Sequence, residues 1–320
     1  MSDAWSADVA DPVPPRSDVD VSLFASPTTH DHIGRVVVPV KINGRGPFRF
    51  IVDTGANHST ISPGLVQALG LKTNTTSPMT LDGITGSAKV SYVSIDQLQA
   101  GALTIERTAL PVVWAPVMGG ADGILGAAGL EDKSLLIDFR RNSVSIASSV
   151  DSRARADTTK IHALRVVNGG LLVVEARVGG VYADAVLDTG AERTLGNLAL
   201  HDALKLHDRG GRGFVAQVTS VYGATTQIEP GEIQRAPPIA IETVQITDVA
   251  VVFGDFHIFK VWEMRARPAI IIGMDVLGTV AALHMDFRNR DVYVGSNPAG
   301  SGRDALQQLH NSLSEQAMKK

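Results

Sequence analysis

Short β-branched segments, bounded by glycine or by polar turns, recur along most of the chain and predict strands. The clearest of them cover residues 36–42, 90–95, 171–178, 214–221 and 249–253. Helical spacing is rare, and it indicates short helices at residues 63–69, at 198–206 and in the tail at 304–318. The pattern therefore predicts an all-β fold with a few short helices.

Landmarks that occur twice in the same order indicate that the chain is built from two matching halves. The first is an apolar strand that runs into Asp-Thr-Gly, at Asp53 in the first half and at Asp188 in the second. The second is a run of aliphatic residues closed by glycine, at Gly126 and at Gly273, each followed by a short predicted helix. Such repetition makes each copy more informative than an isolated motif.

The third landmark is a predicted hairpin with an Arg- and Asn-rich turn, opened by Asp138 in one half and by Asp286 in the other. Turn chemistry explains both carboxylates without catalysis. The expected organisation is a flexible lead-in at 1–33, a first lobe at 34–147, a polar linker at 148–160, a second lobe at 161–297 and a C-terminal tail, helical in part, at 298–320.

Composition narrows the classes of function that remain. With 320 residues and 44% hydrophobic content the chain can bury full cores, which excludes disorder as its main character. A net charge of −4 provides no basic surface, so a nucleic-acid partner is not expected. Because cysteine is absent, disulfides, thiolate metal sites and thiol nucleophiles are excluded.

Two Asp-Thr-Gly motifs in matched frames predict a pair of cooperating carboxylates. If the halves pack around a pseudo-two-fold axis, Asp53 and Asp188 face each other across it. When two carboxylates lie this near each other, ionising both costs free energy because the negative charges repel. The pair therefore retains one proton. One carboxylate can then act as a general base on a water molecule while the protonated one donates to a substrate carbonyl.

Metal binding is the weaker interpretation of the polar residues. Nine histidines are present, but there is no His-Glu-x-x-His motif, and His201 and His207 stand six residues apart, off a common helical face. We therefore expect no metal and no cofactor.

The motifs Asp53-Thr54-Gly55-Ala56-Asn57-His58-Ser59 and Asp188-Thr189-Gly190-Ala191-Glu192-Arg193-Thr194 resemble the active-site motif of the retroviral-type, or retropepsin-like, aspartic proteases. The segment at 271–277 is similar to the second signature of that family. The resemblance covers residues 34–297. It implies two closed-barrel lobes related by a pseudo-two-fold axis, in a single-chain tandem form with the two-lobed arrangement of the pepsins.

Carried onto the matching positions, the resemblance implies that Asp53 and Asp188 are catalytic. It implies supporting roles around the dyad for two threonines, which brace it across the axis, and for two glycines, whose amides approach the carboxylates. These residues are Thr54, Gly55, Thr189 and Gly190.

Substrate-binding residues are expected from the cleft and from two hairpin flaps. In the cleft they are Asn57, His58, Glu192 and Arg193, and at the flap tips they are Gly83, Ile84, Tyr222 and Gly223. Ordinary surface hairpins are the alternative interpretation of the two flap segments. The halves also differ: Asp275 stands two residues after the glycine of the second half, whereas the first half has Ala128 there. Only a supporting interaction is put in question by that difference.

The sequence thus predicts an aspartic endopeptidase, monomeric, that cuts extended peptide or protein substrates. The rival interpretation is a catalytically silent peptide-binding module of the same fold, and a dimer formed by domain exchange is a further alternative. No stretch qualifies as a secretory signal or a membrane span in the given chain. The resemblance favours a periplasmic or secreted location.

Overall fold

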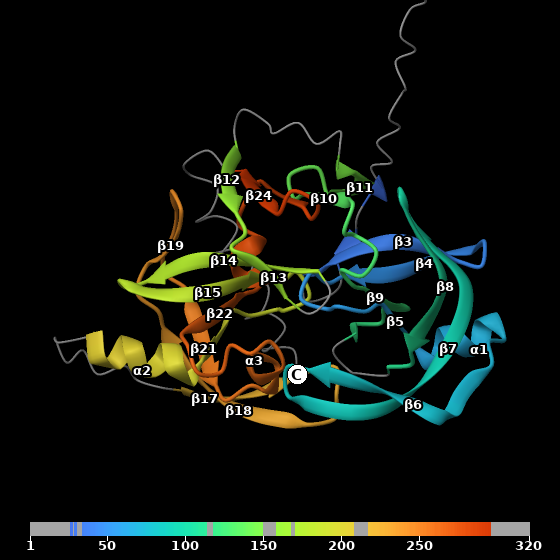
Figure 1. Cartoon of the computed structure of the whole chain (residues 1–320), viewed down its shortest axis with the longest axis horizontal. Coiled ribbons are helices and arrows are strands. Elements are labelled where there is room, and N and C mark those ends of the chain that lie inside the picture. The colour runs from blue at the N-terminus through green and yellow to red at the C-terminus, as the bar shows by residue number, and fades with distance from the viewer. Residues whose placement is uncertain are drawn as a thin grey trace, which may run out of the picture.

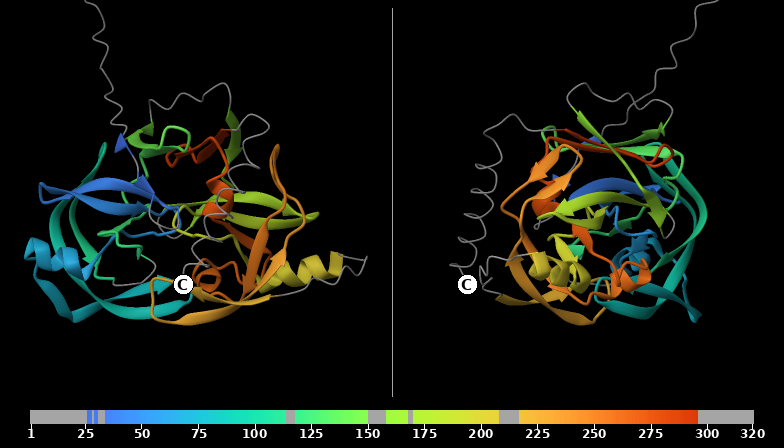
Figure 2. Two further views of the ribbon diagram at one scale, coloured as in Figure 1. Left: turned by 180° about the vertical axis from the view of Figure 1, so that it is seen from behind. Right: turned by 60° about the vertical axis from the view of Figure 1, so that its left-hand side comes forward.

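The computed structural model of the chain describes residues 26–27, 29–30, 34–113, 118–149, 158–167, 170–207 and 217–295. Across these residues the fold is almost entirely β, and it forms two lobes that lie side by side (Figure 1). A further sheet lies at one end of the molecule and two long hairpins lie at the opposite end (Figures 1 and 2). The predicted all-β, two-lobed fold is confirmed.

An eight-stranded sheet and one helix make up the first lobe. Its strands follow the order β5-β9-β4-β3-β7-β6, with β2 paired to β3 and β8 paired to β7. A bridge between Ile61 and Val112 connects β5 to the end of β8 and so closes the sheet into a barrel. The strands are β2 (Thr29–His30), β3 (Val36–Ile42), β4 (Arg45–Val52), β5 (Thr60–Ile61), β6 (Thr73–Gly83), β7 (Gly86–Ala100), β8 (Leu103–Pro111) and β9 (Gly123–Leu125).

The second lobe repeats this pairing scheme in a ten-stranded sheet. Its order is β17-β18-β21-β16-β22-β15-β14-β19-β20, with β13 paired to β14. The strands are β13 (Arg165–Val167), β14 (Leu171–Val178), β15 (Val181–Leu187), β16 (Leu195–Asn197), β17 (Gln217–Tyr222), β18 (Ile228–Arg235), β19 (Ile239–Ile241), β20 (Val244–Ile246), β21 (Ala250–Gly254) and β22 (Ala269–Ile272). The predicted strand at 214–221 corresponds to β17, and its first three residues lie outside the described part.

The lobes differ where a single long strand of the first is replaced by two strands in the second. In the first lobe β7 pairs with both β3 and β6, whereas in the second lobe β19 pairs with β14 and β18 pairs with β17. Pro237 and Pro238 separate β18 from β19. Because proline has no backbone N–H, two in succession interrupt a ladder of hydrogen bonds.

A six-stranded sheet in the order β1-β11-β10-β23-β24-β12 belongs to both lobes. Its centre is the antiparallel pair of β10 and β23, which runs from Ser134 opposite Asp286 to Asp138 opposite Ala282. The strands are β1 (Ser26–Pro27), β10 (Lys133–Asp138), β11 (Ser143–Ser148), β12 (Thr158–His162), β23 (Ala282–Asp286) and β24 (Asp291–Gly295). The lobes are therefore joined by backbone hydrogen bonds as well as by the chain.

Both predicted hairpins of this sheet are confirmed, and each is turned by the aspartate that the sequence indicated. The Asp138 carboxylate accepts a hydrogen bond from the Arg141 amide at 3.0 Å, and the Asp286 carboxylate accepts one from the Asn289 amide at 3.0 Å. These are ordinary turn contacts.

One hydrophobic cluster extends through both lobes and the shared sheet. Its fully buried members include Phe50 and Leu98 of the first lobe, Ile137 and Leu283 of the shared sheet, and Ile271 of the second lobe. Burying a side chain of this size stabilises a fold by about 1.5–3 kcal/mol. The two lobes consequently share one continuous core.

Of the four helices in the described residues, α1 (Pro63–Leu69) matches its predicted range and has clear end signals. The Ser62 hydroxyl accepts a hydrogen bond from the Leu65 amide at 3.2 Å, and Pro63 begins the helix. Gly70 ends it at φ 67°, a left-handed conformation that glycine adopts without strain.

The remaining helices are α2 (Leu198–His207), α3 (His257–Val261) and α4 (Met274–Leu277). Helix α2 is one residue longer than predicted, and α4 follows Gly273 as predicted. The sequence interpretation missed α3. The helix predicted after Gly126 is wrong, because the chain makes a tight turn there, with Leu130 donating to the Ala127 carbonyl and Gly129 at φ 86°.

Three predicted boundaries also change. The expected linker at 148–160 was drawn too wide, because β11 ends at Ser148 and β12 begins at Thr158. The expected flexible lead-in at 1–33 contains β1, paired with β11, and β2, paired with β3. Strand pairing thus reaches into both segments. The predicted helical tail at 304–318 lies outside the described residues.

Candidate active site

Asp53 and Asp188 each follow the last residue of a strand that lies deep in its lobe. Strand β4 runs parallel to β9, and β15 runs parallel to β22. These parallel pairs continue into the dyad, since the Asp53 amide donates to the Leu125 carbonyl at 3.0 Å and the Asp188 amide donates to the Ile272 carbonyl at 2.9 Å. The aliphatic strand before each glycine therefore holds the catalytic candidate in place.

Each carboxylate accepts hydrogen bonds from backbone amides of its own Asp-Thr-Gly-Ala turn. Asp53 Oδ1 accepts hydrogen bonds from the amides of Gly55 and Ala56, both at 2.9 Å. Asp188 Oδ1 accepts equivalent bonds from Gly190 at 2.8 Å and Ala191 at 3.1 Å. One oxygen of each carboxylate is thus occupied by the turn.

The two threonines cross between the lobes, as the resemblance implied. The Thr54 hydroxyl donates to the Leu187 carbonyl at 2.6 Å, and the Thr189 hydroxyl donates to the Val52 carbonyl at 2.7 Å. Each hydroxyl also accepts the backbone amide of the other threonine, at 3.1 and 3.2 Å. Both side chains are fully buried. This reciprocal brace fixes the separation of the two aspartates.

Gly55 and Gly190 are required because each lies directly against the aspartate of the other lobe. A Cβ placed on Gly55 would lie 2.3 Å from Asp188 Oδ2, and one placed on Gly190 would lie 2.3 Å from Asp53 Oδ2. Only glycine lets the two turns approach so closely.

The electrostatics of the dyad favour retention of a proton. Burial raises the pKa of Asp53 well above its ordinary value of 3.8, and the neighbouring Asp188 carboxylate raises this pKa further. Burial also raises the pKa of Asp188, although hydrogen bonds from backbone amides and from Asp53 oppose the rise. The two groups titrate as one unit, and the last proton on the pair is held more strongly than an isolated carboxyl would hold it.

In each lobe a hydroxyl side chain accepts a hydrogen bond from the glycine that closes the aliphatic strand, but only in the second lobe is that hydroxyl bound in turn by a carboxylate. Ser59 accepts the Gly126 amide at 3.1 Å, and Thr194 accepts the Gly273 amide at 3.2 Å. Asp275 accepts both the Thr194 hydroxyl, at 2.7 Å, and the Thr194 amide, at 3.0 Å. The apolar Ala128 stands at the corresponding place in the first lobe, so the carboxylate anchor exists once.

The Asp275 carboxylate is largely buried, and its pKa is shifted. Burial raises its pKa above the ordinary value, while the Thr194 hydrogen bonds and the nearby charge of Arg193 lower it. The anchor is therefore held by specific contacts that offset the cost of burial.

A sequence model described as aspartyl protease matches the chain over residues 38–128 and 174–276, which together are more than half of it. Each matched segment contains one Asp-Thr-Gly turn and one aliphatic–glycine strand. The chain belongs to the aspartyl protease family. A search of curated proteins found no match.

In this member of the aspartyl protease family, four predicted cleft residues lie just beyond the dyad turns. Asn57, His58, Glu192 and Arg193 are all exposed. Their backbones are anchored equivalently, since the Asn57 carbonyl accepts the Ala128 amide at 3.2 Å and the Glu192 carbonyl accepts the Asp275 amide at 3.1 Å. The side chains therefore occupy matched positions with different charge.

The two predicted flaps are hairpins whose tips meet. In the first, β6 and β7 pair as far as Gly83 opposite Gly86, which leaves Ile84 and Thr85 as the turn. The second hairpin joins β17 to β18, and its tip begins at Gly223. A Cβ on Gly223 would lie 2.9 Å from the Thr85 hydroxyl, and one on Gly83 would lie 3.4 Å from the Ala224 amide. The glycines permit this close contact.

Thr85 and Thr225 were missed by the sequence interpretation, yet they make the polar contact between the tips. Their hydroxyls lie 3.2 Å apart, and both side chains are buried. Threonine near a turn carries no distinctive sequence signal. Tyr222, by contrast, is 57% exposed and lies on the opposite face of β17 from the half-buried Val221, so it does not join the tip contact.

Apolar contacts fasten the tips to the dyad region. Leu81 of the first hairpin, Ala224 of the second and Ala56 of the first Asp-Thr-Gly-Ala turn all pack against one small apolar cluster. Val113 and Met118 belong to the same small cluster. Both hairpins therefore share an apolar cluster with one of the dyad turns.

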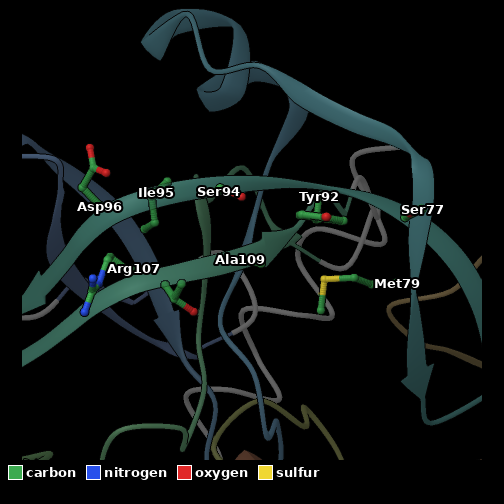
Figure 3. A pocket seen from close by; sticks show the side chains of 9 residues that line it. Ser77, Met79, Tyr92, Ser94, Ile95, Asp96, Arg107 and Ala109 are labelled. Atoms are coloured by element: carbon green, nitrogen blue, oxygen red, sulfur yellow. The ribbon is translucent and has the colours of Figure 1, made fainter.

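Other cavities are remote from the dyad. A hollow of about 630 Å³ lies on β6, β7 and β8, lined by Met79, Tyr92, Asp96 and Arg107 among others, and Figure 3 shows that its residues come from these strands. None of its lining residues belongs to the dyad or to the hairpin tips. Within the described ranges, no cluster of three or more His, Asp or Glu side chains is arranged to hold a metal, and no helix has the length and apolar character to cross a membrane.

Proposed function

We propose that the protein is an aspartic endopeptidase in which Asp53 and Asp188 together activate a water molecule for attack on a peptide bond. The observation that carries the proposal is the matched environment of the two carboxylates. Each accepts two amide hydrogen bonds, each lies against the glycine of the other lobe, and both pKa values are raised by burial.

The chemistry needs one proton on the pair. The ionised carboxylate takes a proton from the water as its oxygen attacks the carbonyl carbon, and the protonated carboxyl donates to the carbonyl oxygen. The tetrahedral diol then collapses: the carboxyl that took the water proton donates it to the leaving nitrogen, the C–N bond breaks, and the other carboxylate recovers a proton from a diol hydroxyl. Because the pKa of the pair is raised, the singly protonated state extends to higher pH than for exposed carboxyls, and activity is lost as the pH rises beyond it.

The proposal includes a retropepsin-like origin for each lobe, by duplication within one chain. The matched strand pairings, the paired threonine brace and the two hairpins that meet at their tips support it. Since one chain supplies both aspartates, we propose that the active protein is a monomer. The periplasmic or secreted location stays a prediction of the family resemblance.

The proposed substrate is an extended peptide held between the dyad and the hairpin tips. Leu81, Ala224 and Ala56 pack against one small apolar cluster in this region, which favours apolar substrate side chains near the scissile bond. Farther along the cleft, Asn57 and His58 face one end of the peptide while Glu192 and Arg193 face the other. We therefore propose that charged substrate residues are selected on one side only.

The test is mass-spectrometric detection of products from an unfolded protein substrate, over a series from about pH 3 to about pH 8, the range in which such dyads titrate. Asp53→Asn and Asp188→Asn are each expected to lower the rate by at least about 10²-fold, the usual contribution of a general acid–base group. Asp96→Asn is the matched control, because Asp96 is an exposed carboxylate on β7, away from the dyad.

Hydrolysis that survives either dyad substitution would refute the two-carboxylate mechanism. If the intact protein cuts nothing at any pH but a peptide raises its melting temperature and is recovered uncut, the chain is the silent peptide-binding module instead. If the protein is active, the new termini of the cleaved peptides would also identify the side chains that each end of the cleft prefers.

A further inference from the structure

The first hairpin contacts the second lobe at α3. The Ile258 amide donates to the Ile84 carbonyl at 3.4 Å, a long hydrogen bond between the hairpin tip and the helix. Beside it, His257 Nε2 donates to Asp82 Oδ1 at 3.0 Å. In Figure 1 the end of the β6 hairpin lies next to α3. Two polar contacts therefore tie this hairpin to a helix of the other lobe.

The second hairpin is attached differently. It reaches the first lobe through the Thr225 hydroxyl, which contacts Thr85, and through apolar Ala224, which packs near Val113 and Met118. Among the described residues, no ion pair joins the β17–β18 hairpin to the first lobe. In the described part of the chain, an ion-paired attachment to the opposite lobe is thus a property of the first hairpin.

The exposure of the Asp82 and His257 side chains allows the contact between them to break and re-form. Asp82 and His257 keep 37% and 27% of their side-chain surface exposed, so water can replace either partner when the contact opens. Ile84, next to them, packs against the main core. A partly exposed polar pair beside a buried apolar tip can separate without leaving a buried charge unpaired.

We propose that Asp82 and His257 form a latch that holds the first hairpin closed against α3 and so controls how fast a peptide reaches the dyad. Both are positioning residues, because neither touches the reacting groups. The part of the proposal that concerns peptide access rests on the proposed function, whereas the closing of the hairpin does not. The latch operates from one side of the cleft, so the two hairpins are expected to open unequally.

Hydrogen exchange in the ligand-free protein tests the latch without any need for activity. In Asp82→Ala and in His257→Ala, the segments 81–87 and 257–261 are expected to exchange about two- to fivefold faster, the range that a partly exposed ion pair supports. The double variant should exchange no faster than either single variant, because both break one contact. His257→Gln, which keeps an N–H donor, should restore part of the protection.

The matched control is Arg265→Ala. Arg265 pairs with Asp255 at 2.9 Å beside the same helix, in an exposed ion pair that does not touch the hairpin. Its loss should leave exchange in segment 81–87 unchanged. Equal exchange in wild type and His257→Ala, or additive acceleration in the double variant, would overturn the latch.

Peptide access is measured separately, by the rate at which fluorescein-labelled insulin B chain associates with the uncleaving Asp53→Asn protein. Adding His257→Ala should raise this rate by the same factor as the hydrogen exchange. Faster exchange with an unchanged association rate would overturn the control of access while leaving the contact itself established. If the labelled peptide fails to bind at all, the proposed function fails, and the exchange data alone decide whether the pair holds the hairpin.

Discussion

Thr54 and Thr189 each donate a hydroxyl hydrogen bond into the opposite lobe and accept the backbone amide of the other threonine. Four buried hydrogen bonds therefore depend on two side chains. This arrangement couples the position of one aspartate to that of the other, because each threonine directly follows its aspartate in the chain.

Replacing Thr54 with valine keeps the shape but removes the hydroxyl, and leaves the Leu187 carbonyl and the Thr189 amide without a partner. We expect a loss of about 1–3 kcal/mol in the free energy of unfolding, the cost of leaving buried polar groups unsatisfied. Urea unfolding measures it. Thr54→Ser, which retains the hydroxyl, should lose much less, and equal stability of the valine and serine variants would contradict the brace.

The Asp53→Asn protein should be more stable than the wild type at neutral pH, although we expect it to be inactive. The folded-state pKa of Asp53 is raised by burial and by Asp188, so ionising the pair opposes folding at high pH. That cost disappears as the pH falls below the ordinary value of 3.8. We expect a gain on the order of 1 kcal/mol at about pH 7.5 and little gain at about pH 3.5.

Thermal unfolding of both proteins at the two pH values checks this expectation. The Asn side-chain oxygen can still accept the amides of Gly55 and Ala56, so the turn should persist. A stability difference that does not change with pH would mean that the dyad is not proton-linked to folding.

Gly55→Ala should disrupt the dyad because the added methyl would collide with the Asp188 carboxylate. A displaced carboxylate lowers hydrolysis, and we expect at least about a 10²-fold loss, as for other misplacements of catalytic groups. Gly64→Ala is the control: only the Ser62 hydroxyl approaches within 4.0 Å of a Cβ there, and the site lies in α1, where alanine is favoured by up to about 1 kcal/mol. Equal activity of the two variants would show that close approach at Gly55 is dispensable.

Asp275→Ala should destabilise the second lobe, because it removes the acceptor of both the amide and the hydroxyl of Thr194. We expect a loss of about 1–3 kcal/mol in urea unfolding. Asp202→Ala, at an exposed position of α2, is the control and should change little. An equal loss of unfolding free energy in both variants would contradict a specific stabilising role for Asp275.

The sequence predicted those parts of the molecule whose signals are local. The repeated Asp-Thr-Gly frames pointed to the dyad, and Ser62, Pro63 and Gly70 marked both ends of α1. Helix α3 was missed because residues 257–261 are apolar and β-branched in part, and tertiary packing decides their conformation. Thr85, Thr225 and the Asp82–His257 contact join residues more than a hundred positions apart, which no local pattern encodes.

The β10–β23 pairing makes this a molecule in which neither lobe is a self-sufficient folding unit. If the polypeptide were cut between residues 149 and 158, each fragment would carry an unpaired sheet edge, β10 on one and β23 on the other. The fragments would complement one another only by meeting in solution, so recovery of the native state would become second order in protein concentration. A chain built in this way is, in physical terms, a dimer whose two subunits are covalently joined.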